Sequence, residues 1–223
     1  MSDEDRPGDR AAEILPADDA GIATAVECLR HGGVVALPTD TVYGIAVDLS
    51  TPGGIERLFE VKRRPPDKGI MLLLADAAQA PTIGLMRPAA LALGAAFWPG
   101  GLTVIVPQRP DVALPAALTG GAPTIGLRVP DHATPRALAA AVGPLPTTSA
   151  NRTGLPEGRD AADIASQLGA DIDLILDGGP ALGGPASTVV DCTGDRPAIL
   201  REGAIGRDRI AAVLEAVGIS LAE

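Results

Sequence analysis

The sequence predicts an α/β chain with α+β character: a single domain with a twisted sheet of mixed parallel and antiparallel strands, flanked by helices. Three observations support this prediction. The length of 223 residues suits one large domain. Short apolar runs typical of buried strands alternate along the chain with amphipathic runs typical of helices. Two strand-like runs near the end follow each other with no helix between them, which favours antiparallel pairing there.

The first four predicted elements are two helices and two strands. Asp18 or Asp19 can N-cap a helix whose apolar residues recur at helical spacing and which a glycine ends. Residues 34–38 are short, apolar and β-branched, and they predict a buried strand. Residues 55–63 are amphipathic and precede a proline, so they predict a helix. The continuous apolar run 70–75 predicts a central strand.

The middle of the chain predicts two more helices and two more strands. Residues 88–98 have a helical pattern, which a proline and two glycines end. Residues 102–106 and 124–129 are apolar runs of strand length. Residues 135–142 again have apolar residues at helical spacing and predict a helix.

The last third of the chain predicts a helix over residues 163–168 and a strand over 174–176. Residues 189–192 and 198–200 are the two strand-like runs that follow each other, and a Thr-Gly-Asp turn between them is compatible with a hairpin. Residues 207–217 predict a closing helix.

The first residues and the apolar segments of the chain indicate where the folded domain begins and in which compartment the protein is expected. Residues 1–13 are rich in Asp, Arg, Gly and Pro and predict a disordered tail, so we expect the folded domain to span 14–223. No apolar segment of a secretory signal opens the chain. The most apolar stretch, 89–106, is broken by glycine and proline and does not predict a membrane helix. We therefore expect a cytoplasmic protein with no membrane partner.

Charge argues against general nucleic-acid binding but leaves one basic segment. The net charge is −10 and the pI is about 4.6, which does not suit binding of phosphates over the whole surface. The chain has sixteen arginines but only two lysines, Lys62 and Lys68, and both lie in the segment 61–69. Lysine offers a compact point charge and arginine a rigid fork. The segment indicates either a site for a nucleoside triphosphate or a solvated basic patch at a helix end.

Several kinds of site are excluded by the residues present. There is no Gly-x-Ser-x-Gly motif, and the two histidines lack partners at metal-ligand spacing. Cys28 and Cys192 lie far apart in apolar runs and predict buried side chains. The glycine-rich run 178–184 lacks the lysine of a phosphate-binding loop, and no dinucleotide-binding motif follows a strand.

Hydroxyl and amide side chains cluster after predicted strands. The runs Pro-Thr-Asp-Thr-Val-Tyr-Gly at 38–44 and Pro-Thr-Thr-Ser-Ala-Asn at 146–151 each follow one, and Ser-Thr at 187–188 opens another. Each run alone is typical of a turn or a helix cap. Together with cations at Arg64, Lys68, Arg128 and Arg201, they predict a cleft that binds a zwitterion and a nucleotide without a nucleophilic side chain.

Five of these segments, in order and at matching spacing, resemble the YrdC-like family of threonylcarbamoyl-AMP synthases. They are Pro-Thr-Asp-Thr-Val-Tyr-Gly, Lys-x-Arg-Pro-x-Asp-Lys, Ser-Ala-Asn, Ser-Thr-Val-Val-Asp and Leu-Arg-Glu-Gly. The resemblance extends from about Ile14 onward. It implies the YrdC-like fold for the whole domain.

The resemblance also implies a reaction. L-Threonine, bicarbonate and ATP would give threonylcarbamoyl-AMP and pyrophosphate, with Mg²⁺ bound mainly through the ATP phosphates. The adenylate would pass to a downstream threonylcarbamoyl transferase, for the threonylcarbamoyladenosine (t6A) modification at position 37 of tRNA. Both chemical steps involve crowded anions, so positioning and charge neutralisation would carry most of the catalysis.

The resemblance implies roles for eleven residues, although each could instead serve as a cap, a turn or a solvated surface group. The implied catalytic cations are Lys62, Arg64 and Lys68. The implied L-threonine contacts are Thr41, Arg128, Thr147 and Ser187. The implied ATP contacts are Arg64, Lys68, Thr124, Ser149, Asn151 and Arg201, and no protein side chain is implied as a metal ligand.

Three departures from the family pattern stand out. Leu73 lies near a position where some relatives carry histidine, and Glu157 lies where some carry a small hydroxyl residue. An acidic side chain would oppose nucleotide binding if it faced the site. The chain ends soon after the last predicted helix, so we also expect it to lack the C-terminal domain of the longer family branch.

Two other functions are compatible with the sequence. One is an RNA-binding module, in which the basic segment 61–69 would line a concave face. The other is a domain that handles carbamoyl-adenylate, as in hydrogenase maturation factors, which are longer and carry zinc-finger-like cysteines. Pyrophosphate release and RNA binding separate these alternatives.

Overall fold

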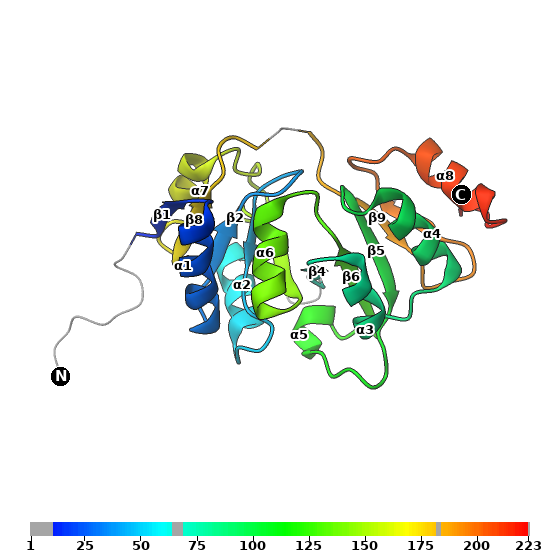
Figure 1. Ribbon diagram of the computed structural model, residues 1–223, viewed down its shortest axis with the longest axis horizontal. Helices are drawn as coiled ribbons and strands as arrows, with labels where there is room; N and C mark the ends of the chain where they lie inside the picture. Colours follow the sequence, from blue (N-terminus) through cyan, green and yellow to red (C-terminus); the bar gives the residue numbers. More distant parts are fainter. Residues whose placement is uncertain (1–10, 64–68, 182–183, 223) are drawn as a thin grey trace.

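The computed structural model describes residues 11–63, 69–181 and 184–222 (Figure 1). Within these residues, strands and helices alternate along the chain, and all ten strands join one mixed sheet. The strand order in the sheet is β1-β8-β2-β3-β7-β4-β6-β5-β9-β10. The predicted mixed α/β fold is therefore confirmed.

The strands are short, and both pairing directions occur. They are β1 Glu13–Pro16, β2 Val35–Leu37, β3 Gly44–Ala46, β4 Met71–Leu73, β5 Leu102–Pro107, β6 Thr124–Arg128, β7 Leu145–Ser149, β8 Leu174–Asp177, β9 Thr188–Asp191 and β10 Ala198–Arg201. The pairs β2–β8, β4–β6 and β5–β9 are parallel, whereas β3–β7, β4–β7 and β5–β6 are antiparallel. The last two strands pair antiparallel, as predicted from the missing helix between them.

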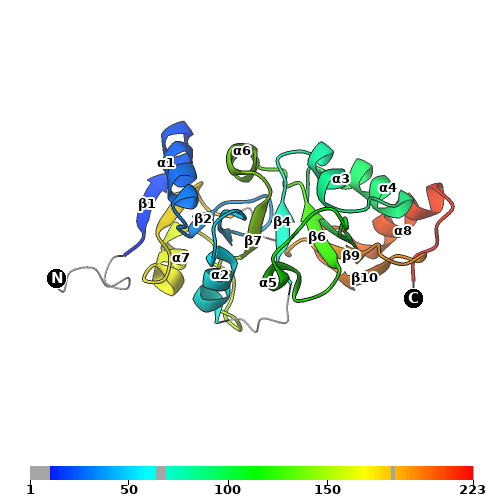
Figure 2. The ribbon, with the colours of Figure 1, turned by 90° about the horizontal axis from the view of Figure 1, so that it is seen from below.

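Helices cover both faces of the sheet. They are α1 Asp19–Arg30, α2 Gly54–Lys62, α3 Ala80–Ile83, α4 Pro88–Phe97, α5 Ala116–Thr119, α6 Ala133–Val142, α7 Ala161–Leu168 and α8 Arg207–Ala216, with a 3₁₀ turn at Ala77–Gln79. Figure 2 shows α1 and α6 on one side of the sheet and α2 and α7 on the other. Helix α4 packs on β5 and against α8. None of the helices in the described ranges is long and apolar enough to cross a membrane.

Side-chain alternation divides the core between the two faces. In β2, Val35 and Leu37 belong to a smaller cluster with α1 and α6, whereas Ala36 belongs to the larger cluster that includes α2 and α7. Successive side chains of a strand point to opposite faces, so a strand covered on both sides reads as a continuous apolar run. This explains why the apolar run at 34–38 predicted a buried strand correctly.

The polar strand β7 and the glycine-containing strand β3 were not among the predicted elements. The polar run 146–151 was predicted to follow a strand, but β7 itself continues through most of the run to Ser149. Its threonines are β-branched and suit a pleated strand between two neighbours. Strand β3 escaped prediction because Gly-Ile-Ala has little strand propensity of its own, and its pairing with β2 and β7 holds it extended. Strand β3 is therefore extended because of its neighbours in the sheet and not because of its own sequence.

The N-terminal edge of the sheet begins earlier than the sequence predicted. The backbone N–H of Ala12 donates to the carbonyl of Gly169 at 2.7 Å, and Glu13 pairs with Leu174. Both residues had been assigned to the tail. Because β1 pairs in parallel with β8, which is far along the chain, no local pattern revealed it.

The first helix provides a test of the local interactions. Its N-cap is Asp18, whose side chain accepts a hydrogen bond from the backbone N–H of Gly21 at 2.9 Å, while Asp19 lies in the first turn. We expect Asp18→Ala to lower the free energy of unfolding by about 1 kcal/mol, because a helix N–H loses its acceptor. Asp19→Ala removes only a favourable first-turn charge and should cost less. Urea unfolding of both variants measures the difference, and an equal or larger loss for Asp19→Ala would contradict this assignment.

Candidate functional site: a polar cavity at the sheet surface

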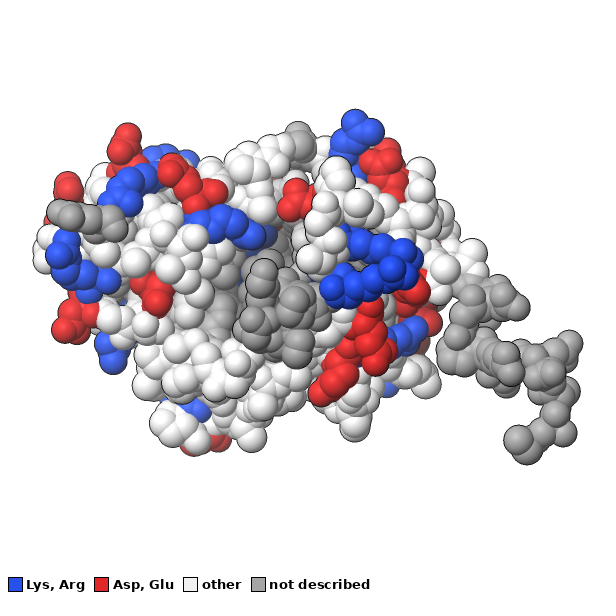
Figure 3. Space-filling model, turned by 180° about the vertical axis from the view of Figure 1, so that it is seen from behind, with Lys and Arg blue, Asp and Glu red and all other residues white. Residues whose placement is uncertain are grey.

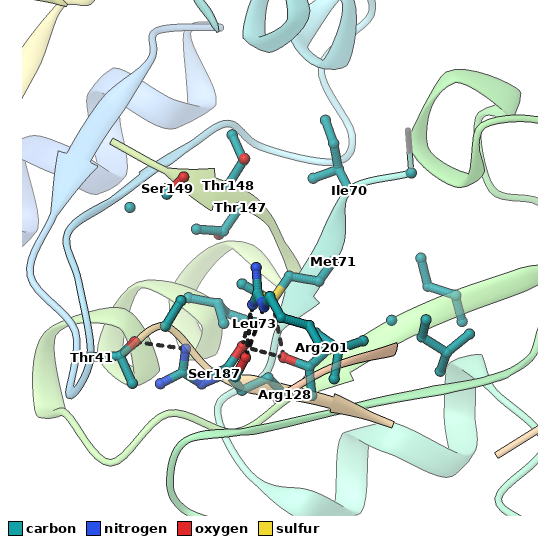
Figure 4. A pocket seen from close by; sticks show the side chains of 18 of the residues that line it. Thr41, Ile70, Met71, Leu73, Arg128, Thr147, Thr148, Ser149, Ser187 and Arg201 are labelled. Atoms are coloured by element: carbon teal, nitrogen blue, oxygen red, sulfur yellow. Dashed lines mark hydrogen bonds between the residues drawn. The ribbon is translucent and has the colours of Figure 1, made fainter. Parts of the chain in front are cut away.

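A cavity of about 450 Å³ lies over the central strands (Figure 4). Its lining follows from the strand register. Met71 pairs with Thr147, and Ile105 pairs with Gly126, and all four line the cavity. A Cβ at Gly126 would lie 3.3 Å from the Cβ of Met71, so glycine keeps this part of the surface open. The volume is in the range of small-molecule sites.

Arg128 connects the loop after β2 to the turn before β5. Its Nη2 donates to Asp40 Oδ1 at 2.6 Å, its Nη1 to Thr41 Oγ1 at 3.0 Å, and its Nε to the Gly100 carbonyl at 3.0 Å. Arg128 is only 2% exposed. Burial lowers the pKa of its guanidinium, and the charge of Asp40 opposes that shift. A guanidinium has five N–H groups, so two remain without an acceptor in the described part of the chain.

Arg201 holds Ser187 at the end of the crossover into β9. Its Nε and Nη2 donate to the Ser187 carbonyl at 3.1 and 2.8 Å, and Nη2 lies 3.2 Å from Ser187 Oγ. Figure 4 shows this pair close to Arg128. The family resemblance implies that Arg201 contacts ATP and that Ser187 contacts threonine. Their contact places the two expected ends of the site side by side.

Ser149, a residue of the cavity lining, is held by hydrogen bonds to Lys62 and Asn151. The Lys62 ammonium donates to the Ser149 carbonyl at 2.6 Å, to Ser149 Oγ at 3.2 Å and to Asn151 Oδ1 at 2.8 Å. Ser149 Oγ also donates to Asn151 Oδ1 at 2.7 Å. Ser149 lines the cavity, whereas Lys62 and Asn151 do not. Their contacts give both residues a positioning role, and the catalytic and ATP-binding roles predicted for them stay predictions.

The remaining predicted residues fall into two groups. Thr124 and Thr147 line the cavity, and Thr147 is 2% exposed, with its hydroxyl donating to the Leu145 carbonyl at 2.9 Å. Arg64 and Lys68 lie outside the described residues. Of the nine predicted residues that the structure describes, seven therefore line one cavity: Thr41, Thr124, Arg128, Thr147, Ser149, Ser187 and Arg201.

Sequence reasoning missed several lining residues. Thr39 stands in the Pro-Thr-Asp-Thr-Val-Tyr-Gly run, where its hydroxyl donates to the Val42 carbonyl at 2.6 Å and could have been found from that motif. Thr103 lies inside an apolar strand and gave no signal except its polarity. Leu73 and Glu157, the two departures from the family pattern, both line the cavity. Glu157 is the one carboxylate among the described lining residues.

Tyr43 fastens the long connection between β8 and β9. Its buried hydroxyl donates to the Gly179 carbonyl at 2.6 Å and accepts from the Gly178 N–H at 3.0 Å. Burial raises the pKa of this phenol. The connection crosses from the second to the ninth strand of the sheet, and Ala186 and Ser187 at its end line the cavity. The described residues of the glycine-rich run, 178–181 and 184, lie in this connection between two strands.

Comparison with protein families identifies the chain. The family model described as "Telomere recombination", which groups Sua5, YciO and YrdC proteins, matches residues 27–203. The chain belongs to the Sua5–YciO–YrdC family. The matched segment of this Sua5–YciO–YrdC domain contains every described residue that lines the cavity.

Three similar proteins are informative. The threonylcarbamoyl-AMP synthase of Bacillus subtilis is 39% identical over 202 residues, which are 90% of this chain and 58% of the relative. A putative threonylcarbamoyl-AMP synthase of Mycobacterium tuberculosis is 37% identical over 90% of this chain and 92% of the relative. The crystal structure of Pyrococcus abyssi Sua5 complexed with L-threonine has a TM-score of 0.84 and 31% identity, over 95% of this chain and 61% of that one. This Sua5–YciO–YrdC domain thus spans little more than half of the B. subtilis and P. abyssi proteins.

The ion pair of Arg128 provides a test of how the cavity is held together. We expect Asp40→Ala to lower the free energy of unfolding by about 3 kcal/mol, because it leaves a buried guanidinium without its counter-charge. Asp111→Ala is the matched control, since that aspartate pairs with Arg109 at the surface and should have little effect. Urea unfolding measures the free energy of unfolding of both variants. An equal loss in the two would show that the buried pair of Asp40 and Arg128 stabilises the protein no more than a surface pair.

Proposed function

We propose that the chain is a threonylcarbamoyl-AMP synthase. The threonine amine attacks bicarbonate, water leaves, and a carbamate forms. A carbamate oxygen then attacks the α-phosphorus of ATP, and pyrophosphate departs with the electrons of the broken P–O bond. The products are threonylcarbamoyl-AMP, pyrophosphate and water. The chain covers 58% of the B. subtilis relative and 92% of the M. tuberculosis relative, so the activity of these relatives is a proposal for this chain.

The observation that carries the proposal is the convergence of seven predicted side chains on one cavity. They come from the loop after β2, from β6 and β7, from the residue before β9 and from β10, so no short segment could have brought them together. The lining combines hydroxyls with two guanidinium groups, a composition that suits a zwitterion beside a polyphosphate. It offers no cysteine or histidine among the described lining residues, in keeping with chemistry that relies on positioning.

Arg128 is suited to the threonine end. Its three protein contacts fix the plane of the guanidinium, and its two remaining N–H groups are available to a carboxylate. Thr41 is held by the same group and would be positioned with it. Because the donors are already oriented before substrate binds, little ordering is left for the binding step.

At the nucleotide end, the cavity lining offers the hydroxyls of Ser149 and Thr124 and the guanidinium of Arg201. Mg²⁺ would neutralise part of the triphosphate charge when it accompanies ATP. No group of three Asp, Glu, His or Cys side chains among the described residues could hold a metal by itself. We propose, in line with the family resemblance, that phosphate oxygens and water supply most of the ligands of Mg²⁺.

The proposed partners follow from the product. An acyl-adenylate is reactive toward water, so a threonylcarbamoyl transferase acting on tRNA should consume it soon after release, and we place both steps in the cytoplasm. Basic and acidic side chains lie next to each other on the face shown in Figure 3, and the chain has a net charge of −10. We propose that any direct contact with tRNA is weak.

Pyrophosphate release tests the proposal directly. We expect release from Mg²⁺–ATP only when both L-threonine and bicarbonate are present, with each omission returning the rate to background. Release without threonine would instead favour a carbamoyl-adenylate activity. No release from a folded, ATP-binding sample, together with RNA binding that weakens steeply with salt, would favour the RNA-binding module.

Glu157 should weaken nucleotide binding. Its carboxylate lines the cavity and would repel the triphosphate. We expect Glu157→Gln to lower the Kd for ATP about threefold at low ionic strength, and the gain to shrink at high salt. Glu215→Gln on α8, also exposed, is the matched control. Isothermal titration calorimetry measures both, and weaker ATP binding by Glu157→Gln would show that the carboxylate contacts the nucleotide or its Mg²⁺ favourably.

A further inference from the structure

We infer that Thr103 is a positioning residue of the threonine end: its hydroxyl orients Ser187 so that the Ser187 O–H points to an anionic oxygen of the substrate. The inference rests on the proposed function and deepens it. No prediction from the sequence assigned a role to Thr103.

Thr103 lies in β5 with its side chain in the cavity lining, and it is 3% exposed. Its Oγ1 is 2.9 Å from Ser187 Oγ and 3.4 Å from the sulfur of Met71. The residues are 84 positions apart, and β5 and β9 bring them together as parallel neighbours. Thr103 is therefore held by the sheet in contact with a residue expected to bind threonine.

The direction of the hydrogen bond between Thr103 and Ser187 decides whether Ser187 can donate its own proton to a ligand. A serine hydroxyl has one proton and two lone pairs. One lone pair of Ser187 Oγ already faces Nη2 of Arg201 at 3.2 Å. If Thr103 donates to the other lone pair, both are occupied, and the Ser187 proton can only go to a ligand. If Ser187 donates to Thr103 instead, Thr103 must give its proton to the Met71 sulfur, and Ser187 offers a ligand only a lone pair.

The charges around Ser187 favour the first arrangement. Arg128 and Arg201 both line this cavity, so the ligand group that enters beside them is an anion. An anionic oxygen accepts hydrogen bonds and has no use for another lone pair. An O–H···O bond is also stronger than one to a thioether sulfur, which is a weak acceptor. Thr103 thus donates to Ser187, and Ser187 donates to the carboxylate of threonine or to the carbamate formed from it.

The test compares Thr103→Val, which keeps the shape but removes the hydroxyl, with Thr103→Ser, which keeps the hydroxyl. We expect Thr103→Val to weaken the interaction with threonine about tenfold, the size of one oriented hydrogen bond, and Thr103→Ser to restore most of it. The Kd for ATP should stay unchanged. Thr82→Val on α3 is the matched control, because it removes an exposed threonine hydroxyl by the same substitution. If Thr103→Val does not fold, Thr103→Ala takes its place.

Two readouts locate the hydrogen bond. Calorimetry with L-threonine in the absence of bicarbonate reports on the carboxylate, and a raised Kd supports a bond to that group. An unchanged Kd with a lower kcat supports a bond to the carbamate. Equal weakening of threonine and ATP binding would overturn the inference, because a general packing defect would affect both ends. No change in either Kd or kcat would overturn it as well.

A double-mutant cycle shows whether Thr103 acts through Ser187. In the Ser187→Ala background, Thr103→Val should have almost no further effect on threonine binding, whereas additive losses would overturn the inference. The proposed function fails separately, if the wild-type chain releases no pyrophosphate in a threonine-dependent way. The cycle can still be measured by threonine binding in that case, and a wild-type chain that binds no threonine overturns the inference too.

Discussion

The buried charge of Arg128 is the constraint on which the cavity depends. A guanidinium removed from water must be compensated where it stands, and here Asp40, Thr41 and the Gly100 carbonyl provide that compensation. These partners lie in two different loops, before β3 and before β5, so one side chain sets the distance between both loops and strand β6. The position of Thr41 in the cavity follows from this arrangement. Without Arg128, two loops at the rim would lose their common anchor.

Lys62 shows the same use of a buried cation with a different result. Its ammonium has three N–H groups, and it bonds to the carbonyl and hydroxyl of Ser149 and to the amide of Asn151. Arg128, in contrast, retains N–H groups that face no acceptor in the described part of the chain. The difference matches the chemistry of the two residue types, since a point charge can be surrounded while a planar fork can hold the protein on some edges and a ligand on another. Lys62 holds Ser149, a residue of the cavity lining, in place. Arg128 holds Thr41 in place and also lines the cavity itself.

Much of the fold was predictable because local patterns and global packing agree. The apolar run that became β2 is buried on both faces, and those that became β4, β5 and β6 bury the face turned away from the cavity. Helix α1 begins at one of the two capping residues expected. Strand β7 extends into a polar run that was predicted only to follow a strand. Thr147 can be buried there because its hydroxyl donates to the Leu145 carbonyl. Strands β1 and β3 depend on partners far along the chain. Seven predicted site residues line the cavity, but their predicted roles rest on family resemblance.

The sequence by itself determined the class of fold, most helices and strands, and the motifs that place the chain in its family. It could not show which polar groups face a ligand and which face the protein. Lys62 meets Ser149, Arg128 meets Thr41, and Thr103 meets Ser187, at separations of 87, 87 and 84 residues. Such contacts depend on strand order, and strand order depends on long crossovers such as the one Tyr43 fastens. Only the tertiary structure decides these pairs, because a hydrogen bond requires two atoms within about 3 Å and no local pattern specifies that distance.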